Sequence, residues 1–189
     1  MDSSSDITAW RRTTRAELIA RRMAEDPGVR AGWGAGIEKR LTQLLATEPP
    51  SLLGIYWPMR GEFDPRPLAI GLLKRGWQAA MPVVTAPKSP LEFRPWTPDC
   101  AMESGVWDIP APRDGPAVCP DILLVPVVGF DARRFRLGYG GGYFDRTLAA
   151  LSPQPVAIGV GFEFQRLPNI VPREFDIPMD LIVTETTIY

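Results

Sequence analysis

A group of glycines at residues 138–142 carries the strongest chemical signal in the sequence. It lies between a long apolar run and a helical pattern, with Arg136 before it and Asp145 and Arg146 after it. Glycine permits positive φ and close backbone approach, so successive N–H groups can converge on an anion such as a phosphate. Asp145 offers the kind of carboxylate that binds Mg²⁺ together with substrate phosphates. The stretch therefore predicts a site for a nucleotide and a metal ion.

A structural interpretation of the same stretch is the alternative. The glycines can form a tight turn, with Asp145 and Arg146 as an exposed ion pair, and a carboxylate at a helix start also stabilises the helix dipole. Two common nucleotide motifs do not fit. A G-x-G-x-x-G match beginning at Gly138 would need glycine where Tyr143 stands, and the Lys-Ser/Thr pair of a P-loop is missing. Dinucleotide-binding and P-loop proteins are therefore excluded.

An arginine-rich amphipathic helix is expected over residues 7–24. Its apolar positions are Ile7, Trp10, Leu18, Ile19 and Met23. Arg11 and Arg15 are four residues apart and would share one helical face, where two guanidinium groups can bind a phosphate. Surface arginines that are only solvated are the alternative.

Histidine is absent from the 189 residues. This excludes Ser-His and Cys-His nucleophilic pairs, H-E-x-x-H zinc proteases and any imidazole base. Phosphoryl transfer stays open, because its catalysis rests mainly on positioning and charge neutralisation. The formal net charge of −1 gives no broad basic surface for a nucleic acid. Cys100 and Cys119 are too few for a zinc ribbon or a disulfide scaffold.

The chain shows no apolar run of the signal-peptide or membrane-spanning type, and its first six residues are polar and acidic apart from Met1. We therefore expect a cytoplasmic protein that acts without a membrane.

Short apolar runs alternate with helical patterns after residue 50, which predicts one α/β domain over residues 1–189. We expect a layered sandwich with a mostly parallel central sheet flanked by helices. The expected strands are 52–57, 78–84, 122–128, 156–160 and 181–184, and the further helices are 29–46, 67–75 and 142–151. The proline-rich residues 85–120 are expected to be irregular, with a short strand near 91–96, and residues 26–28 should end the first helix. The glycine loop would then lie at the carboxyl edge of the sheet, where ligands bind in such folds.

The run from Arg136 to Arg146 reads R-L-G-Y-G-G-G-Y-F-D-R. It resembles the signature of the 5-formyltetrahydrofolate cyclo-ligase family, whose members are also called methenyltetrahydrofolate synthetases. Similarity extends to residues 56–62, 91–94, 107–110 and 174–180. The resemblance implies ATP- and Mg²⁺-dependent conversion of 5-formyltetrahydrofolate to 5,10-methenyltetrahydrofolate, with release of ADP and phosphate, through phosphorylation of the formyl oxygen. We expect a monomer whose partners are ATP and a reduced folate, not nucleic acid.

The resemblance also implies roles for individual residues. Arg136 and Asp145 would be catalytic, and Asp145 and Asp180 would bind the metal ion. The substrate-binding positions are Trp57, Glu62, Trp107, Tyr139 and Tyr143. The ATP-binding positions are Arg11, Arg12, Thr13, Thr14, Arg15, Arg136, Leu137, Gly138, Tyr139, Gly140, Gly141, Gly142, Tyr143 and Phe144. Without the resemblance, Glu62 would be an exposed loop carboxylate and Asp180 a solvated strand end.

The chain departs from the family pattern at two positions. Arg11 replaces a Lys, and a planar guanidinium is not equivalent to a compact ammonium. Phe175 stands where the family often has His, next to Asp176, which is the other acidic match. These departures leave open a relative that binds folate or nucleotide without turnover. Sugar-phosphate isomerisation or acyl transfer on a similar scaffold is a third alternative, from fold analogy alone.

Overall fold

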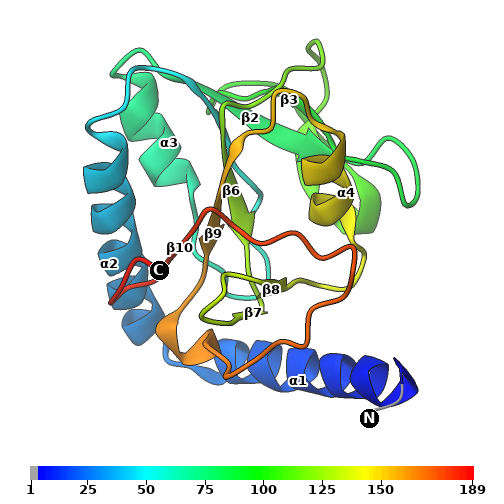
Figure 1. Cartoon of the computed structure of the whole chain (residues 1–189). Helices are drawn as coiled ribbons and strands as arrows, with labels where there is room; N and C mark the ends of the chain where they lie inside the picture. Colours follow the sequence, from blue (N-terminus) through cyan, green and yellow to red (C-terminus); the bar gives the residue numbers. More distant parts are fainter. Residues whose placement is uncertain (1–3) are drawn as a thin grey trace.

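A six-stranded sheet forms the centre of the protein (Figure 1). The structure is a computed structural model that describes residues 4–189, so residues 1–3 of the predicted polar start lie outside the described residues. The strand order is β10-β9-β6-β1-β2-β3. The bounds are β1 Leu52–Gly54, β2 Gln78–Val83, β3 Glu92–Pro95, β6 Ile122–Pro126, β9 Val156–Val160 and β10 Leu181–Val183. All neighbours pair in parallel except β3, which is antiparallel to β2. The prediction of a mostly parallel sheet in an α/β fold is confirmed.

Strand β6 shows why the sheet needs a layer on each face. Ile122 and Leu124 pack into one hydrophobic core, whereas Leu123 and Val125 pack into the other. Successive side chains of a strand point to opposite faces, so an unbroken apolar run is buried on both sides.

Helices α2 (Pro27–Leu45) and α3 (Arg66–Leu73) cover one face, and α4 (Tyr143–Ala150) covers the other (Figure 1). The start of α2 follows from its sequence. The side chain of Asp26 accepts hydrogen bonds from the amides of Gly28 and Val29, and Pro27 is the first helical residue. Residues 26–28, expected to end the first helix, therefore also begin the second one.

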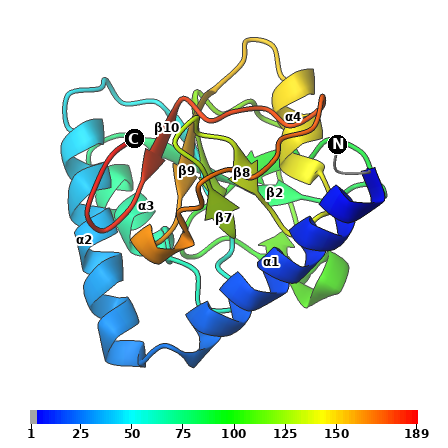
Figure 2. The same ribbon diagram turned by 60° about the horizontal axis from the view of Figure 1, so that its bottom comes forward.

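Helix α1 (Ser4–Ala24) lies apart from these layers, alongside the hairpin β7 (Gly129–Phe130) and β8 (Arg136–Leu137) (Figures 1 and 2). The helix was expected, but its inward face differs from the prediction. Trp10 and Met23 are 36% and 55% exposed, so part of the predicted apolar face is in solvent. The inward face carries Leu18 and a series of polar residues, namely Arg11, Thr14, Arg15 and Arg22.

The proline-rich residues 85–120 contain β3 and a small hairpin, β4 (Met102–Ser104) and β5 (Pro110–Pro112). A short 3₁₀ turn, η1 (Val106–Asp108), connects the two hairpin strands, and a second one, η2 (Glu163–Gln165), follows β9. The expected strands after residue 50 are present, although β1 is only three residues long. No helix within residues 4–189 has the length and apolar character needed to cross a membrane.

Candidate functional site

A cavity of about 1540 Å³ opens at the carboxyl edge of the sheet. Its walls include Trp57 after β1, Val83 at the end of β2 and Pro126 at the end of β6. The glycine loop, the β4–β5 hairpin and the segment 173–177 complete the walls. Single-ligand pockets usually measure roughly 300–1,000 Å³, so this cavity has room for more than one small molecule. Its place matches the ligand position predicted from the strand pattern.

The glycine loop has the backbone geometry of an anion site. Gly140 and Gly142 have φ of 97° and 67°, which non-glycine residues seldom adopt. Gly142 is the N-cap of α4 and supplies no side-chain cap. The first amides of a helix have no partner within the helix, and they attract anions. Arg15 lies against this loop, with its Nε donating to the carbonyl oxygen of Gly138 at 2.6 Å.

Arg136 and Asp145 form an ion pair of 3.1 Å, with side chains 4% and 18% exposed. The Asp145 carboxylate also accepts a hydrogen bond from the amide of Ile177 at 3.2 Å. Burial lowers the pKa of Arg136, and the carboxylates of Asp145 and Asp176 oppose that shift. The alternative of an exposed Asp145–Arg146 pair does not fit, because Asp145 pairs with Arg136.

Asp176 and Asp180 lie in different surroundings. Asp176 lines the cavity and forms a 2.6 Å ion pair with Arg11. Asp180 is exposed and precedes β10, where its carboxylate accepts a hydrogen bond from the amide of Ala157 at 2.7 Å. Ala157 pairs with Leu123, near the amino ends of the parallel strands, so Asp180 lies at the edge of the sheet away from the cavity. The expectation that Asp180 shares a metal ion with Asp145 is corrected, because Asp180 does not line the cavity, whereas Asp176 lines it together with Asp145.

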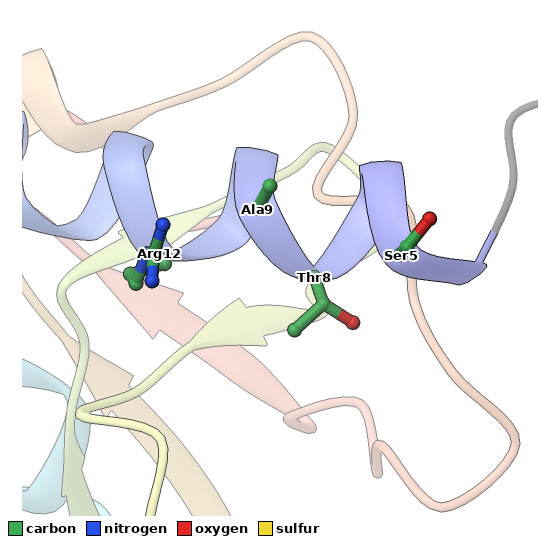
Figure 3. A pocket seen from close by; sticks show the side chains of 4 residues that line it. All are labelled: Ser5, Thr8, Ala9 and Arg12. Atoms are coloured by element: carbon green, nitrogen blue, oxygen red, sulfur yellow. The ribbon is translucent and has the colours of Figure 1, made fainter.

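Helix α1 brings only part of its predicted ATP contacts to the cavity. Arg11 and Arg15 line it, whereas Arg12 and Thr13 are exposed on other faces of the helix and Thr14 is buried without lining the cavity. Figure 3 shows Arg12 at an open hollow of the helix surface that is lined by Ser5, Thr8, Ala9 and Arg12. Residues at successive positions of a helix point in different directions, which is why the whole run cannot face one ligand.

The predicted ATP-binding residues of the glycine loop also fall into two groups, those that line the cavity and one that does not. Leu137, an expected ATP-binding position, is completely buried in the β7–β8 pairing and does not line the cavity. The cavity is lined by Arg136 and by every residue from Gly138 to Phe144.

Glu62 and Tyr139 meet at the cavity in a buried hydrogen-bond network. The Tyr139 hydroxyl donates to Oε1 of Glu62 at 2.7 Å, and the amide of Met59 donates to Oε2 at 2.9 Å. Burial raises the pKa of Glu62, and Arg22 is the largest of the opposing influences. The interpretation of Glu62 as an exposed loop acid is therefore wrong.

Arg22 completes this network and was missed from the sequence. Its side chain is 1% exposed, and its guanidinium donates to the Tyr139 hydroxyl at 2.7 Å. One signal was available: Arg22 follows Arg11, Arg15 and Leu18 at spacings of four, three and four, which places all of them on one helical stripe.

Three aromatic side chains of the predicted substrate site line the cavity. Trp57 has the guanidinium of Arg66 4.2 Å from its ring centroid. Trp107 is 66% exposed at a φ of 59°, and it contacts Tyr143 edge to face at 5.6 Å. The cavity therefore offers exposed aromatic faces beside its charged groups.

The residues present fit a magnesium ion that is bound partly by substrate. Within residues 4–189, no group of three or more His, Cys, Asp and Glu is arranged to hold a metal ion. Mg²⁺ is usually bound by one or two carboxylates together with phosphate oxygens, which is the donor set that Asp145 and Asp176 offer beside the glycine loop.

Comparison with known proteins agrees with this geometry. The model of the 5-formyltetrahydrofolate cyclo-ligase family matches residues 7–185. The 5-formyltetrahydrofolate cyclo-ligase of Escherichia coli (strain K12) is 30% identical over 158 residues, which cover 77% of this chain and 86% of the relative. The enzyme of the same name from Haemophilus influenzae is 30% identical over 139 residues, covering 69% and 74%.

Solved structures extend the comparison to the fold. The NMR structure of Aquifex aeolicus 5,10-methenyltetrahydrofolate synthetase superimposes with a TM-score of 0.82 at 27% identity, covering 94% of this chain and 91% of that one. A 5,10-methenyltetrahydrofolate synthetase from Mycoplasma pneumoniae, at 23% identity and a TM-score of 0.77, shares the fold. The family model covers most of the chain, and the glycine-loop signature lines the cavity. The chain belongs to the 5-formyltetrahydrofolate cyclo-ligase family.

Proposed function

We propose that this protein catalyses the ATP- and Mg²⁺-dependent cyclisation of 5-formyltetrahydrofolate to 5,10-methenyltetrahydrofolate, with release of ADP and phosphate. One observation carries the proposal. The phosphate-type loop, with Arg136 and Asp145 at its ends, lines the same cavity as the buried carboxylate of Glu62. A reaction that transfers a phosphoryl group from a nucleotide to a second substrate needs both binding regions in one cavity.

In this proposal, the phosphates of the nucleotide bind at the glycine loop. The uncapped amides at the start of α4 and the guanidinium of Arg15 supply donors to phosphate oxygens. Arg136 keeps a positive charge at the loop, since a guanidinium remains protonated even when burial lowers its pKa. Such preorganised donors stabilise the charge that moves during transfer.

The folate, in the same proposal, binds beside Glu62 and the aromatic side chains of the cavity. Glu62 already accepts hydrogen bonds from Tyr139 and Met59, and a carboxylate has further acceptor sites for the N–H groups of an amino-substituted ring. Trp57, Trp107 and Tyr143 offer faces for stacking on the planar parts of the substrate.

The chemistry needs no protein nucleophile. The formyl oxygen takes the terminal phosphoryl group of ATP, N10 of the folate attacks the same carbon, and the C–O bond breaks as phosphate leaves with that oxygen. N10 loses its proton in the ring closure, and the departing phosphate can accept it. The chain's own residues hold the reacting groups in line, which accords with the absence of histidine.

Asp145 and Asp176 would hold the magnesium ion. When bound, the ion would neutralise negative charge on the phosphate oxygens. Asp145 is positioned by the Ile177 amide and Arg136, and Asp176 by Arg11 and the Arg173 amide.

A second candidate is a relative that binds its ligands without turnover. Two observations support it. Arg11 already forms an ion pair with Asp176, and Phe175, where the family often has His, is 65% exposed. Titration calorimetry with 5-formyltetrahydrofolate and a non-hydrolysable ATP analogue, combined with a turnover assay, separates the two. Simultaneous binding with turnover supports the ligase, and binding without turnover supports the second candidate.

We also propose that the protein acts as a monomer in the cytoplasm. The support for the cytoplasm is that the chain has only two cysteines, too few for a disulfide scaffold, which suits a reducing compartment. A sedimentation experiment at micromolar concentration tests the first part of this proposal.

A further inference from the structure

Arg22 is the least exposed of the charged groups near the cavity, yet it does not line the cavity itself. Its side chain is 1% exposed. Nε donates to the carbonyl oxygen of Arg60 at 2.9 Å, and Nη1 lies 3.5 Å from the carbonyl oxygen of Val127. Nη2 donates to the Tyr139 hydroxyl at 2.7 Å. One side chain of α1 thus contacts three segments that form cavity walls or their supports.

The donors and acceptors of the three side chains determine the direction of the hydrogen bonds among Arg22, Tyr139 and Glu62. A guanidinium only donates, so the Tyr139 oxygen must accept from Arg22, and its proton is then directed to Glu62. Nη2 of Arg22 also lies 3.7 Å from Oε1 of Glu62. The order Arg22, Tyr139, Glu62 is therefore the one that satisfies all three side chains.

We infer that Arg22 is a positioning residue for folate binding, which holds Tyr139 and Glu62 in the orientation that the substrate requires. This inference rests on the proposed function. It adds a residue that contacts neither the folate nor ATP, because Arg22 does not line the cavity. A charge buried to this degree is costly unless it is paired, so its retention beneath the cavity calls for a role that a small apolar side chain would not fill.

The electrostatics of Glu62 support the same role. Burial raises its pKa, and the opposing influences are Arg22, the hydrogen bonds from Tyr139 and Met59, and Arg60. Tyr56 is a further titratable group beside Glu62, and its own pKa is raised well above its usual range by burial and by Glu62. Removal of the Arg22 cation should raise the pKa of Glu62 further, so that the carboxyl group stays protonated up to a higher pH.

The test compares Arg22→Met, Arg22→Lys and Tyr139→Phe with the unmodified protein in steady-state turnover from pH 5 to 9. For Arg22→Met we expect kcat/KM for 5-formyltetrahydrofolate to fall by about tenfold or more at pH 7, since a charged hydrogen bond is lost. The acidic limb of the pH profile should move to higher pH. Arg22→Lys keeps the charge and should return that limb towards its original position. Tyr139→Phe should lower kcat/KM while keeping the buried cation.

Two controls separate positioning from folding. Arg21→Met alters the neighbouring arginine, which lies over the ring of Phe164 outside the cavity, and should leave the profile unchanged. Calorimetric titration of the variants with 5-formyltetrahydrofolate alone, beside their melting temperatures, identifies any that fail to fold. Should Arg22→Met not fold, the Arg22→Lys and Tyr139→Phe profiles decide the question.

A folded Arg22→Met variant whose kcat/KM falls equally at every pH, or does not fall, overturns the inference and leaves the proposed function intact. If the unmodified protein neither turns over nor binds the folate, the proposed function fails and the role of Arg22 fails with it.

Discussion

Arg136 and Asp145 are 3.1 Å apart across the two ends of the glycine loop, joining the end of the β7–β8 hairpin to the first turn of α4. This ion pair holds the two ends of the loop together, and Gly140 and Gly142 between them have positive φ angles. Because the Asp145 carboxylate also meets the Ile177 amide, the loop and the segment 173–177 are held against each other at the cavity.

Replacement of Asp145 by Asn should lower turnover by about 100-fold or more, because the proposed metal ligand and the charge partner of Arg136 are lost together. Stability should fall by about 3 kcal/mol, since Arg136 is 4% exposed and would remain as an unpaired buried cation. Steady-state kinetics and urea unfolding measure the two effects.

Asp180→Asn is the matched control, because this carboxylate is exposed and lies at the other edge of the sheet. The amide oxygen of Asn can still accept the Ala157 hydrogen bond, so we expect activity and stability near those of the unmodified protein. Loss of activity in Asp180→Asn, with activity kept in Asp145→Asn, would reverse the assignment of the metal ligands.

Arg15→Met should raise KM for ATP by about tenfold, because one charged phosphate contact and the support of Gly138 disappear. Arg12→Met, on the same helix but exposed on another face, should leave KM for ATP unchanged. Equal effects in the two variants would mean that α1 acts only through its overall charge. The comparison needs initial rates at saturating folate.

The Glu62→Gln variant should show a different dependence of stability on pH. Burial raises the pKa of Glu62 above its ordinary value of 4.5, so the protonated form favours the folded state. The stability this provides is present below pH 4.5 and is lost as pH rises through the folded-state pKa. Melting temperatures measured from pH 4 upwards should therefore fall in the unmodified protein relative to Glu62→Gln. A constant difference across that range would show that the pKa of Glu62 is not raised.

Gly142→Ala should destabilise the protein by about 1–2 kcal/mol, because a residue with a Cβ is strained at a φ of 67°. The new Cβ would also lie 2.9 Å from the Arg146 guanidinium, at the start of α4 where phosphate is proposed to bind. ATP affinity should fall with it. Gly71→Ala, in α3 with no atom within 4 Å of the added Cβ, should instead be neutral or stabilising by up to about 1 kcal/mol.

The sequence was sufficient for the sheet and the glycine loop, because both depend on local patterns. The apolar run at 122–128 predicts a buried strand, and glycines with flanking charges predict an anion site. Helix α1 shows where this reasoning fails. Its inward face is polar because it packs on cavity walls that need hydrogen bonds, so the apolar residues Trp10 and Met23 pointed to the wrong face.

The choice between Asp176 and Asp180 also lay beyond the sequence. Both precede the last strand, four residues apart, and only the path of the segment 173–177 over the cavity separates them. Its spacing places Arg22 on the helical stripe of Arg11 and Arg15, but its contacts could not be read from the sequence for a related reason. Its partners Arg60, Val127 and Tyr139 are distant in sequence and meet only in the folded chain.

The most direct measurement is the coupling of two products in one reaction. The purified protein is mixed with 5-formyltetrahydrofolate, ATP and Mg²⁺, and the absorbance of methenyltetrahydrofolate is followed together with the release of ADP. We predict equal amounts of the two products, and neither product when ATP or Mg²⁺ is omitted. ADP release without methenyltetrahydrofolate, or no product and no ATP binding at saturating Mg²⁺, would contradict the assignment of the cavity as a cyclo-ligase active site.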